Sequence, residues 1–184
     1  MKKFLSIVFG IIFIMGIFIC ISKAGELDIS RTYWNNPTQI KTYIPPNHKY
    51  TAKFKRACAE WSRLTRNGIV FKYVSNENDA QIRVYFVKQI SQADSAAGLT
   101  QSFGNPASGR LGGSKIWIAD YTIYGKLSDD EVYTSMLHEL GHAIGLGHSN
   151  NPDSIMYPNT SRVKTMEISK EDLNLLAKKY NWKK

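Results

Sequence analysis

Three of the four histidines in this chain lie within eleven residues, in the pattern His-Glu-x-x-His-x-x-Gly-x-x-His. An α-helix advances about 3.6 residues per turn, so His138 and His142 lie one above the other on one face, where both can bind one metal ion. Gly145 can adopt the left-handed conformation that ends a helix, and the turn can bring His148 back as a third ligand. Three histidines leave one position of a tetrahedral zinc ion for water, which is typical of a catalytic site.

Glu139 directly follows the first histidine, which is the position of the general base in His-Glu-x-x-His zinc sites. We therefore expect Glu139 to take a proton from a zinc-bound water. The simpler alternative is an amphipathic helix that carries histidines on its polar face by coincidence. The complete pattern has odds of roughly a few in a million by chance in a chain of this composition, so we favour the metal site.

The metal-binding pattern needs a helix to position it, and the residues before it supply a helix start. Ser128 and Glu131 form a capping box, in which the serine accepts a bond from a first-turn amide and the glutamate returns one. We expect this helix to run from about residue 129 to residue 144. Apolar residues that recur at three- and four-residue steps predict its buried face: Val132, Met136, Leu140 and Ala143.

The remaining elements predict an α+β fold. Alternating or β-branched and aromatic segments predict strands at 39–44, 69–74, 80–87, 99–103 and 115–119. Further helices are expected at 51–64, from its apolar periodicity, and at 169–180, which opens with a second serine cap. The order strand, helix, strand, strand indicates a mixed sheet with a crossover helix.

Residues 1–24 have the features of an export segment. Lys2 and Lys3 precede an uncharged apolar run at 4–21, and Ser22-Lys23-Ala24 offers small residues for cleavage, as in a secretory signal peptide. The run is also just long enough to span a bilayer, so an uncleaved membrane anchor remains an alternative. In both cases we expect residues 25–184 to form one exported domain, either secreted, extracellular or held at the cell envelope.

Charge and cysteine content restrict the partners further. The formal net charge is +9, but the lysines and arginines are scattered, and no nucleic-acid-binding module accompanies them. We therefore expect no nucleic-acid partner. Cys58 would be the one cysteine left after cleavage, and it lies on the apolar face of the predicted helix at 51–64, which favours a buried, inert thiol.

The histidine pattern, followed by Ser149 and by the run Ser154-Ile155-Met156-Tyr157-Pro158, resembles the matrixin family of metzincin metalloproteases. Ser149 directly follows the third histidine, where astacins have glutamate and adamalysins have aspartate. Pro158 stands where astacins carry an additional tyrosine ligand, so Tyr157 is not expected to bind metal. The resemblance covers most of residues 38–182.

The resemblance implies a metzincin or zincin-like fold. It consists of a twisted five-stranded mixed sheet with one antiparallel edge strand, two long helices, and a small C-terminal subdomain with a third helix. Met156 would lie beneath the metal as a hydrophobic floor. A peptide substrate would pair with the edge strand and place one side chain in a pocket beside the methionine turn. The residues implied are Leu99, Thr100, Gln101, Tyr157, Pro158, Asn159 and Thr160; the alternative for all of them is ordinary strand and loop.

The sequence departs from vertebrate matrixins in several respects. Only about a dozen residues separate Ala24 from the first predicted strand, so a pro-segment with a cysteine switch is not expected. Gln101 and Ile116 stand where the family has histidines for a structural zinc, which leaves one catalytic zinc ion. Calcium is weakly indicated, with Asp94 and Asp120 as isolated candidates.

These features together predict an exported zinc-dependent endopeptidase that acts on protein or peptide substrates as a monomer. Glu139 would pass the proton it accepts to the leaving amine. The alternative is a catalytically silent binding or adhesion module with the same fold, against which the intact Glu139 argues. Membrane contact is expected only through residues 4–21, if they are not removed.

Overall fold

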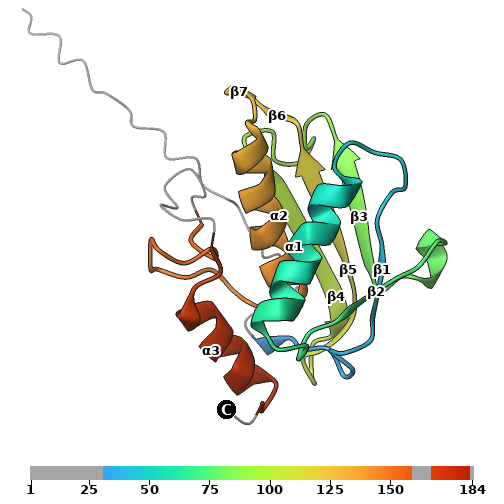
Figure 1. Ribbon diagram of the computed structural model, residues 1–184, viewed down its shortest axis with the longest axis vertical. Coiled ribbons are helices and arrows are strands. Elements are labelled where there is room, and N and C mark those ends of the chain that lie inside the picture. The colour runs from blue at the N-terminus through green and yellow to red at the C-terminus, as the bar shows by residue number, and fades with distance from the viewer. Residues whose placement is uncertain (1–30, 159–166, 183–184) are drawn as a thin grey trace, which may run out of the picture.

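A five-stranded sheet forms the centre of the computed structural model, which describes residues 31–158 and 167–182. Its strands are β1 (Ile40–Tyr43), β2 (Phe71–Tyr73), β3 (Ile82–Val87), β4 (Gly98–Asn105) and β5 (Arg110–Ala119). Their spatial order is β2-β1-β3-β5-β4, and β4 alone runs antiparallel to its neighbour (Figure 1). The predicted mixed sheet with one antiparallel edge strand is therefore confirmed.

Strands β4 and β5 extend beyond their predicted segments and join in a hairpin. The residues between the predicted segments are rich in glycine, which suggests a loop, but the strand pairing requires one glycine and the turn between the strands requires another. A Cβ at Gly104 would lie 2.1 Å from the carbonyl oxygen of Arg110, next to the register shift that follows Phe103. Gly109 has a φ of 71°, a left-handed conformation that favours glycine.

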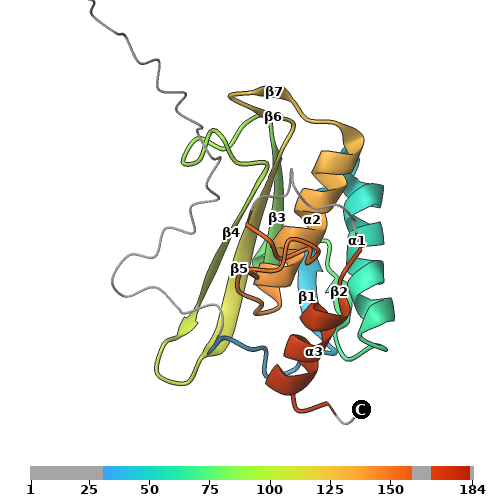
Figure 2. The same ribbon diagram turned by 90° about the vertical axis from the view of Figure 1, so that its left-hand side faces the viewer.

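Two long helices, α1 (Thr51–Leu64) and α2 (Asp129–Ala143), lie on the same face of the sheet (Figure 2). Helix α1 has the predicted bounds, and its Trp61 indole donates a hydrogen bond of 3.0 Å to the Leu137 carbonyl oxygen of α2. The predicted inner face of α2 is confirmed, since its four apolar residues are buried. Cys58 is also buried, and burial raises the pKa of its thiol, as expected for an inert cysteine.

The third helix, α3 (Lys170–Lys179), begins at the second predicted serine cap and packs at the end of α2. The Tyr180 hydroxyl donates to the Ile144 carbonyl oxygen at 2.9 Å and accepts from the Trp34 amide at 3.2 Å. The Trp34 indole donates to the Ala143 carbonyl oxygen at 2.8 Å. These contacts join the segment before β1, the end of α2 and the C-terminal subdomain.

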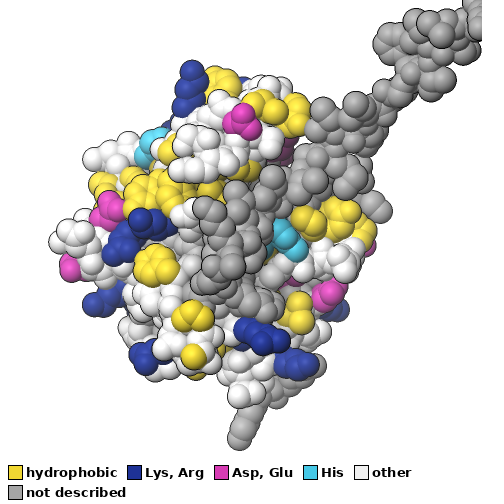
Figure 3. Space-filling model, turned by 180° about the vertical axis from the view of Figure 1, so that it is seen from behind, with side chains coloured by type: hydrophobic (Ala, Val, Ile, Leu, Met, Phe, Trp, Pro, Cys, Tyr) yellow, Lys and Arg dark blue, Asp and Glu magenta, His cyan; other side chains and the backbone are white. Residues whose placement is uncertain are grey.

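The smaller elements lie around the sheet. Strands β6 (Tyr121–Thr122) and β7 (Gly125–Lys126) form a hairpin before α2, and the 3-10 helix η2 (Glu77–Asp79) precedes β3. On the face shown in Figure 3, lysine and arginine side chains lie dispersed among other residues. Within the described part of the chain, no helix combines the length and apolar character needed to cross a membrane. The predicted export segment, residues 1–24, lies outside that part.

Candidate metal centre and active site

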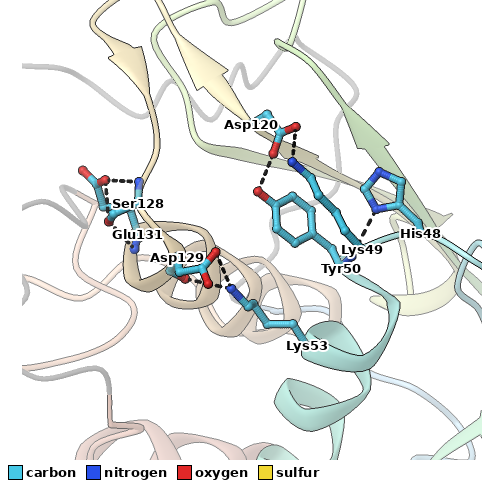
Figure 4. Close-up of polar contacts among 8 residues, drawn as sticks. All are labelled: His48, Lys49, Tyr50, Lys53, Asp120, Ser128, Asp129 and Glu131. Carbon is cyan, nitrogen blue, oxygen red and sulfur yellow. Dashed lines mark hydrogen bonds and ion pairs between the residues drawn. The ribbon is translucent and has the colours of Figure 1, made fainter.

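The start of helix α2 is fixed by its own cap and by a contact with α1. The Ser128 amide donates to Glu131 Oε2 at 2.7 Å, and the Glu131 amide donates to Ser128 Oγ at 3.2 Å (Figure 4). Asp129 in the same turn pairs with Lys53 of α1 at 2.8 Å. Acidic residues at a helix start also interact favourably with the helix dipole. The sequence therefore determines where the helix begins, and so where along it the histidines lie.

His138 and His142, one turn apart on α2, direct their Nε2 atoms toward each other and toward His148. His142 Nε2 lies 3.0 Å from His138 Nε2 and 3.2 Å from His148 Nε2. One potential ligand atom from each residue lies within 4.8 Å of the other two. Among residues 31–158 and 167–182, this is the only group of three or more His, Cys, Asp or Glu side chains that could hold a metal ion.

Backbone carbonyls set the protonation of the two helical imidazoles. His138 Nδ1 lies 2.7 Å from the Ile155 carbonyl oxygen, and His142 Nδ1 lies 2.8 Å from that of Leu146. A carbonyl oxygen only accepts, so each Nδ1 donates and each Nε2 presents a lone pair. Facing lone pairs repel unless a cation lies between them. Tetrahedral zinc, with Zn–N bonds of about 2.0–2.1 Å, places its nitrogens about 3.3–3.4 Å apart, so this donor set fits zinc.

Burial lowers the pKa of all three histidines. For His142 the value falls to about 4, mainly through burial and then through the charge of His148, while the bond to the Leu146 carbonyl opposes the change. Burial and then the charge of His142 lower the pKa of His138, and burial lowers that of His148. The imidazoles are consequently neutral near pH 7, which is the form that binds metal.

Gly145 turns the chain after the second histidine. Its φ is 98°, and a Cβ there would lie 2.4 Å from the carbonyl oxygen of Thr32. Only glycine suits this combination of conformation and contact. The Leu146 amide donates to the Gly141 carbonyl oxygen at 2.9 Å and closes the helix end. The chain then returns with His148 beside the helical pair, as expected from the spacing.

Met156 packs against α2 at its glycine. A Cβ on Gly141 would lie 2.2 Å from the Met156 sulfur, so the absent side chain leaves the room that the methionine fills. Met156 is buried, and its carbonyl oxygen accepts from the Ser149 amide at 2.9 Å. The neighbouring Ile155 supplies the carbonyl that orients His138. This turn thus packs against α2 at Gly141 and orients the His138 imidazole.

A buried carboxylate of α3, which sequence reasoning missed, anchors the same turn. Ser154 Oγ donates to Asp172 Oδ1 at 2.6 Å and accepts from the Met156 amide at 2.9 Å. The other oxygen of Asp172 accepts from the Ser169 amide at 3.0 Å. The available signal was an aspartate three residues after a helix-start serine, and that pattern predicts only a cap.

The side chain of Glu139 extends from α2 to the edge strand β4, and 1% of the residue's surface is exposed. Thr100 Oγ1 donates to Glu139 Oε2 at 2.6 Å. Burial raises the pKa of Glu139 to about 8, and the hydrogen bond from Thr100 acts in the opposite direction. A cation bound by the adjacent histidines would also favour the ionised carboxylate.

Strand β4 presents one edge that no strand of the described residues pairs with. The bond of 3.0 Å from the Ala119 amide to the Ala97 carbonyl oxygen marks a hydrogen-bonded pair, and such pairs alternate along an antiparallel ladder. The main-chain groups of Leu99 therefore point toward β5. Those of Gly98 and Thr100 point toward the free edge.

The side chains of the predicted β4 binding residues lie on both faces of the sheet. Thr100 is buried against Glu139, and Gln101 is exposed. Leu99 packs on the opposite face against a cluster of Ile90, Ala96 and Ala119. Ile116, which stands where the family resemblance would place a histidine for a structural zinc, is a fully buried core residue. The binding role of Leu99, Thr100 and Gln101 remains a prediction.

The predicted pocket wall begins directly after the methionine turn. Tyr157 and Pro158 are half-buried there. Asn159 and Thr160 lie outside the described residues, so their predicted contact with substrate remains a prediction.

The carboxylate of Asp120, a calcium candidate, is engaged by the chain's own donors. One oxygen accepts from Lys49 Nζ at 2.7 Å, and the other accepts from the Tyr50 hydroxyl (Figure 4). The main-chain carbonyl oxygen of Asp94 accepts a hydrogen bond of 2.9 Å from the Ile123 amide. These contacts give calcium no support, and calcium binding remains a prediction.

Comparisons with known proteins agree with this geometry. A family model described as matrixin matches residues 32–181. Interstitial collagenase from Equus caballus is 28% identical over 142 residues, which cover 74% of this chain and 29% of that protein. Matrix metalloproteinase-26 from Homo sapiens is 28% identical over 171 residues, which cover 83% of this chain and 61% of that protein. The chain thus spans less than two thirds of the length of these relatives.

A solved structure has the same fold. That of myroilysin superimposes with a TM-score of 0.54 and 18% sequence identity, and the match covers 83% of this chain and 97% of that one. At this identity the likeness establishes the fold alone. It agrees with the predicted arrangement of a mixed sheet, two long helices and a third helix in a C-terminal subdomain.

Proposed function

Because the chain belongs to the matrixin family of metalloproteases, we propose that it is an exported zinc-dependent endopeptidase that hydrolyses peptide bonds in protein or peptide substrates. One observation carries this proposal: imidazole Nε2 atoms converge at helix α2, which also carries the buried carboxylate of Glu139 directly after the first histidine. His138, His142 and His148 would hold one zinc ion, and Glu139 would be the base.

The chemistry divides between the metal and the chain. Zinc in a three-histidine site is a Lewis acid that polarises a carbonyl and makes water more acidic. Glu139 would take a proton from the attacking water and deliver it to the leaving amine. Because the Glu139 side chain is 1% exposed, bulk water would compete little for that proton. The carbonyls of Ile155 and Leu146 would hold two imidazoles in the tautomer that leaves Nε2 unprotonated.

An extended peptide would add to the free edge of β4. The main-chain groups of Gly98 and Thr100 support this proposal, because both point away from β5 and lie beside Glu139. The segment that begins at Tyr157 would form the wall of the pocket for the side chain after the scissile bond. We propose that this side chain is apolar.

Export would depend on residues 1–24. A cleaved signal peptide would release residues 25–184, whereas a retained segment would anchor the peptidase at the membrane. N-terminal sequencing of the exported protein separates the two. A start near Gly25 supports cleavage, and a start at Met1 supports an anchor.

The proposed activity is tested by expressing the full chain in a secreting host and offering the exported protein a denatured protein mixture. New N-termini are then identified by mass spectrometry, with and without a zinc chelator. Cleavage that stops on chelation and returns with added zinc is expected. No cleavage would favour the silent binding module, and cleavage that survives chelation would contradict the zinc mechanism.

A further inference from the structure

Glu139 reaches its place through contacts made by two residues of β4. Thr100 Oγ1 lies 2.6 Å from Glu139 Oε2 and 3.1 Å from the Glu139 carbonyl oxygen. Both side chains are buried, at 9% and 1% exposure. We propose that Thr100, through its hydroxyl, and Gly98, through its missing side chain, position the Glu139 carboxylate for catalysis. This inference rests on the proposed function.

The threonine is suited to hold a carboxylate in one orientation. A glutamate side chain has three torsions, and burial alone does not select one carboxylate position. A threonine on a strand is restricted at χ1 because it is branched at Cβ, so its hydroxyl has a defined direction. The hydroxyl has one hydrogen, and the shorter distance assigns it to Oε2 rather than to the carbonyl oxygen. A hydrogen bond to a carboxylate is stronger than one between neutral groups.

Gly98 provides the space for the same carboxylate. A Cβ at this position would lie 2.6 Å from Glu139 Cγ, 2.7 Å from Oε1 and 2.9 Å from Cδ. These atoms are the far end of a flexible side chain, whereas the strand backbone is held by β5. A methyl group at Gly98 would therefore displace the carboxylate and leave the sheet in place. Thr100 binds one oxygen of Glu139, and Gly98 lies against the other.

The same two residues face the edge where the peptide would lie. Their main-chain groups point away from β5, while the Thr100 side chain points to Glu139. Gly98 and Thr100, two residues apart in β4, thus contact Glu139 and also form the edge where substrate is proposed to bind. A shift of about 1 Å in a catalytic group can cost about a hundredfold in rate, so this common support has a measurable consequence.

The kinetic test compares Thr100→Val with Thr100→Ser in the zinc-loaded protein as it is exported, with a peptide substrate found in the cleavage experiment. We expect Thr100→Val to lower kcat by about 10- to 100-fold with KM changed less than about twofold. Thr100→Ser keeps a hydroxyl and should restore kcat to within about threefold of the unchanged protein. Zinc content should stay at that of the unchanged protein in both variants.

Thr42→Val is the matched control, because Thr42 is a fully buried strand threonine whose hydroxyl donates to the Ile40 carbonyl instead. It should leave kcat unchanged. An unaltered kcat in Thr100→Val, a serine variant as impaired as the valine variant, or an equal loss in Thr42→Val would each overturn the positioning role. Gly98→Ala should lower kcat while its unfolding midpoint stays near that of the unchanged protein.

A second test detects the contact without any turnover. Urea unfolding of the chelated protein is measured for Thr100→Val, Glu139→Ala and the double variant. We expect the change in the free energy of unfolding of the double variant to differ from the sum of the changes in the two single variants, because the two side chains are in contact. Additive shifts would overturn the inference even if the protein is an active peptidase. No hydrolysis by the unchanged protein would instead reject the proposed function, and with it the catalytic role of Thr100.

Discussion

Replacing Glu139 with glutamine should stabilise the zinc-free protein, and the gain should grow as the pH rises. Burial raises the pKa of Glu139 from an ordinary value of 4.5 to about 8. Between these values the unfolded chain carries an ionised glutamate, while the folded chain keeps it protonated. Folding then takes up a proton, so the stability of the unchanged protein declines as the pH rises toward about 8. Glutamine has nearly the same shape and no charge to lose.

The structure sets an upper limit on this effect. Each pKa unit corresponds to about 1.4 kcal/mol, so a rise from 4.5 to about 8 allows about 5 kcal/mol, of which about 3.5 kcal/mol falls between pH 5 and pH 8. Water entry and relaxation around a buried ionised group reduce such differences. We therefore expect the advantage of Glu139→Gln over the unchanged protein to increase by roughly 2–3 kcal/mol from pH 5 to pH 8.

The assay is urea unfolding in the presence of a zinc chelator at both pH values. Glu60→Gln is the control, because Glu60 lies at the surface of α1 and pairs with the exposed Arg63 at 2.7 Å. It should change the free energy of unfolding by less than about 0.5 kcal/mol at either pH. An advantage of Glu139→Gln that is equal at pH 5 and pH 8 would refute the reasoning about a buried, protonated carboxyl group.

Other perturbations should act through contacts elsewhere in the site. Gly141→Ala places a Cβ where the Met156 sulfur lies, and should lower the free energy of unfolding by about 1–3 kcal/mol in a urea titration; unchanged stability would contradict the packing. Ser128→Ala removes the cap of α2 and should cost about 1 kcal/mol in the same assay, whereas no loss would mean that the cap contributes little. The pKa of His142 is lowered to about 4 in the folded protein, so between about pH 6.5 and pH 4 the unfolded chain binds a proton that the folded chain does not. The free energy of unfolding of the zinc-free protein should therefore fall by up to about 3 kcal/mol as the pH drops from 6.5 to 4. His142→Asn should reduce that loss, and an equal loss in this variant would assign it to other groups.

Local signals predicted the elements that carry the site. The bounds of α1 and the start of α2 follow from apolar spacing and from the Ser128 cap, which act within a few residues of chain. The turn at Gly145 follows from its spacing after His142, because the backbone there requires a positive φ. The sheet order also agrees with the arrangement that the family resemblance implies.

Contacts between distant segments could not be predicted in this way. The hydroxyl of Thr100 meets Glu139 only because β4 packs against α2, and nothing near either residue in the sequence indicates the pair. The same holds for Asp172, whose Oδ1 accepts a hydrogen bond from Ser154, 18 residues earlier in the chain. The extra length of β4 was missed because its glycines suggest a loop. Gly104 is nevertheless a strand residue, because any side chain there would collide with the backbone of β5 at Arg110.

We propose that the protein hydrolyses peptide bonds with one zinc ion held by three histidines and with Glu139 as the base. The most direct measurement compares the peptide hydrolysis rates of the unchanged protein and Glu139→Ala at equal, measured zinc content. We expect one zinc per chain in both proteins and a loss of at least about 100-fold in the variant, which is the lower end of what general-base catalysis contributes. A zinc-loaded Glu139→Ala protein that retains most of the rate would contradict the account.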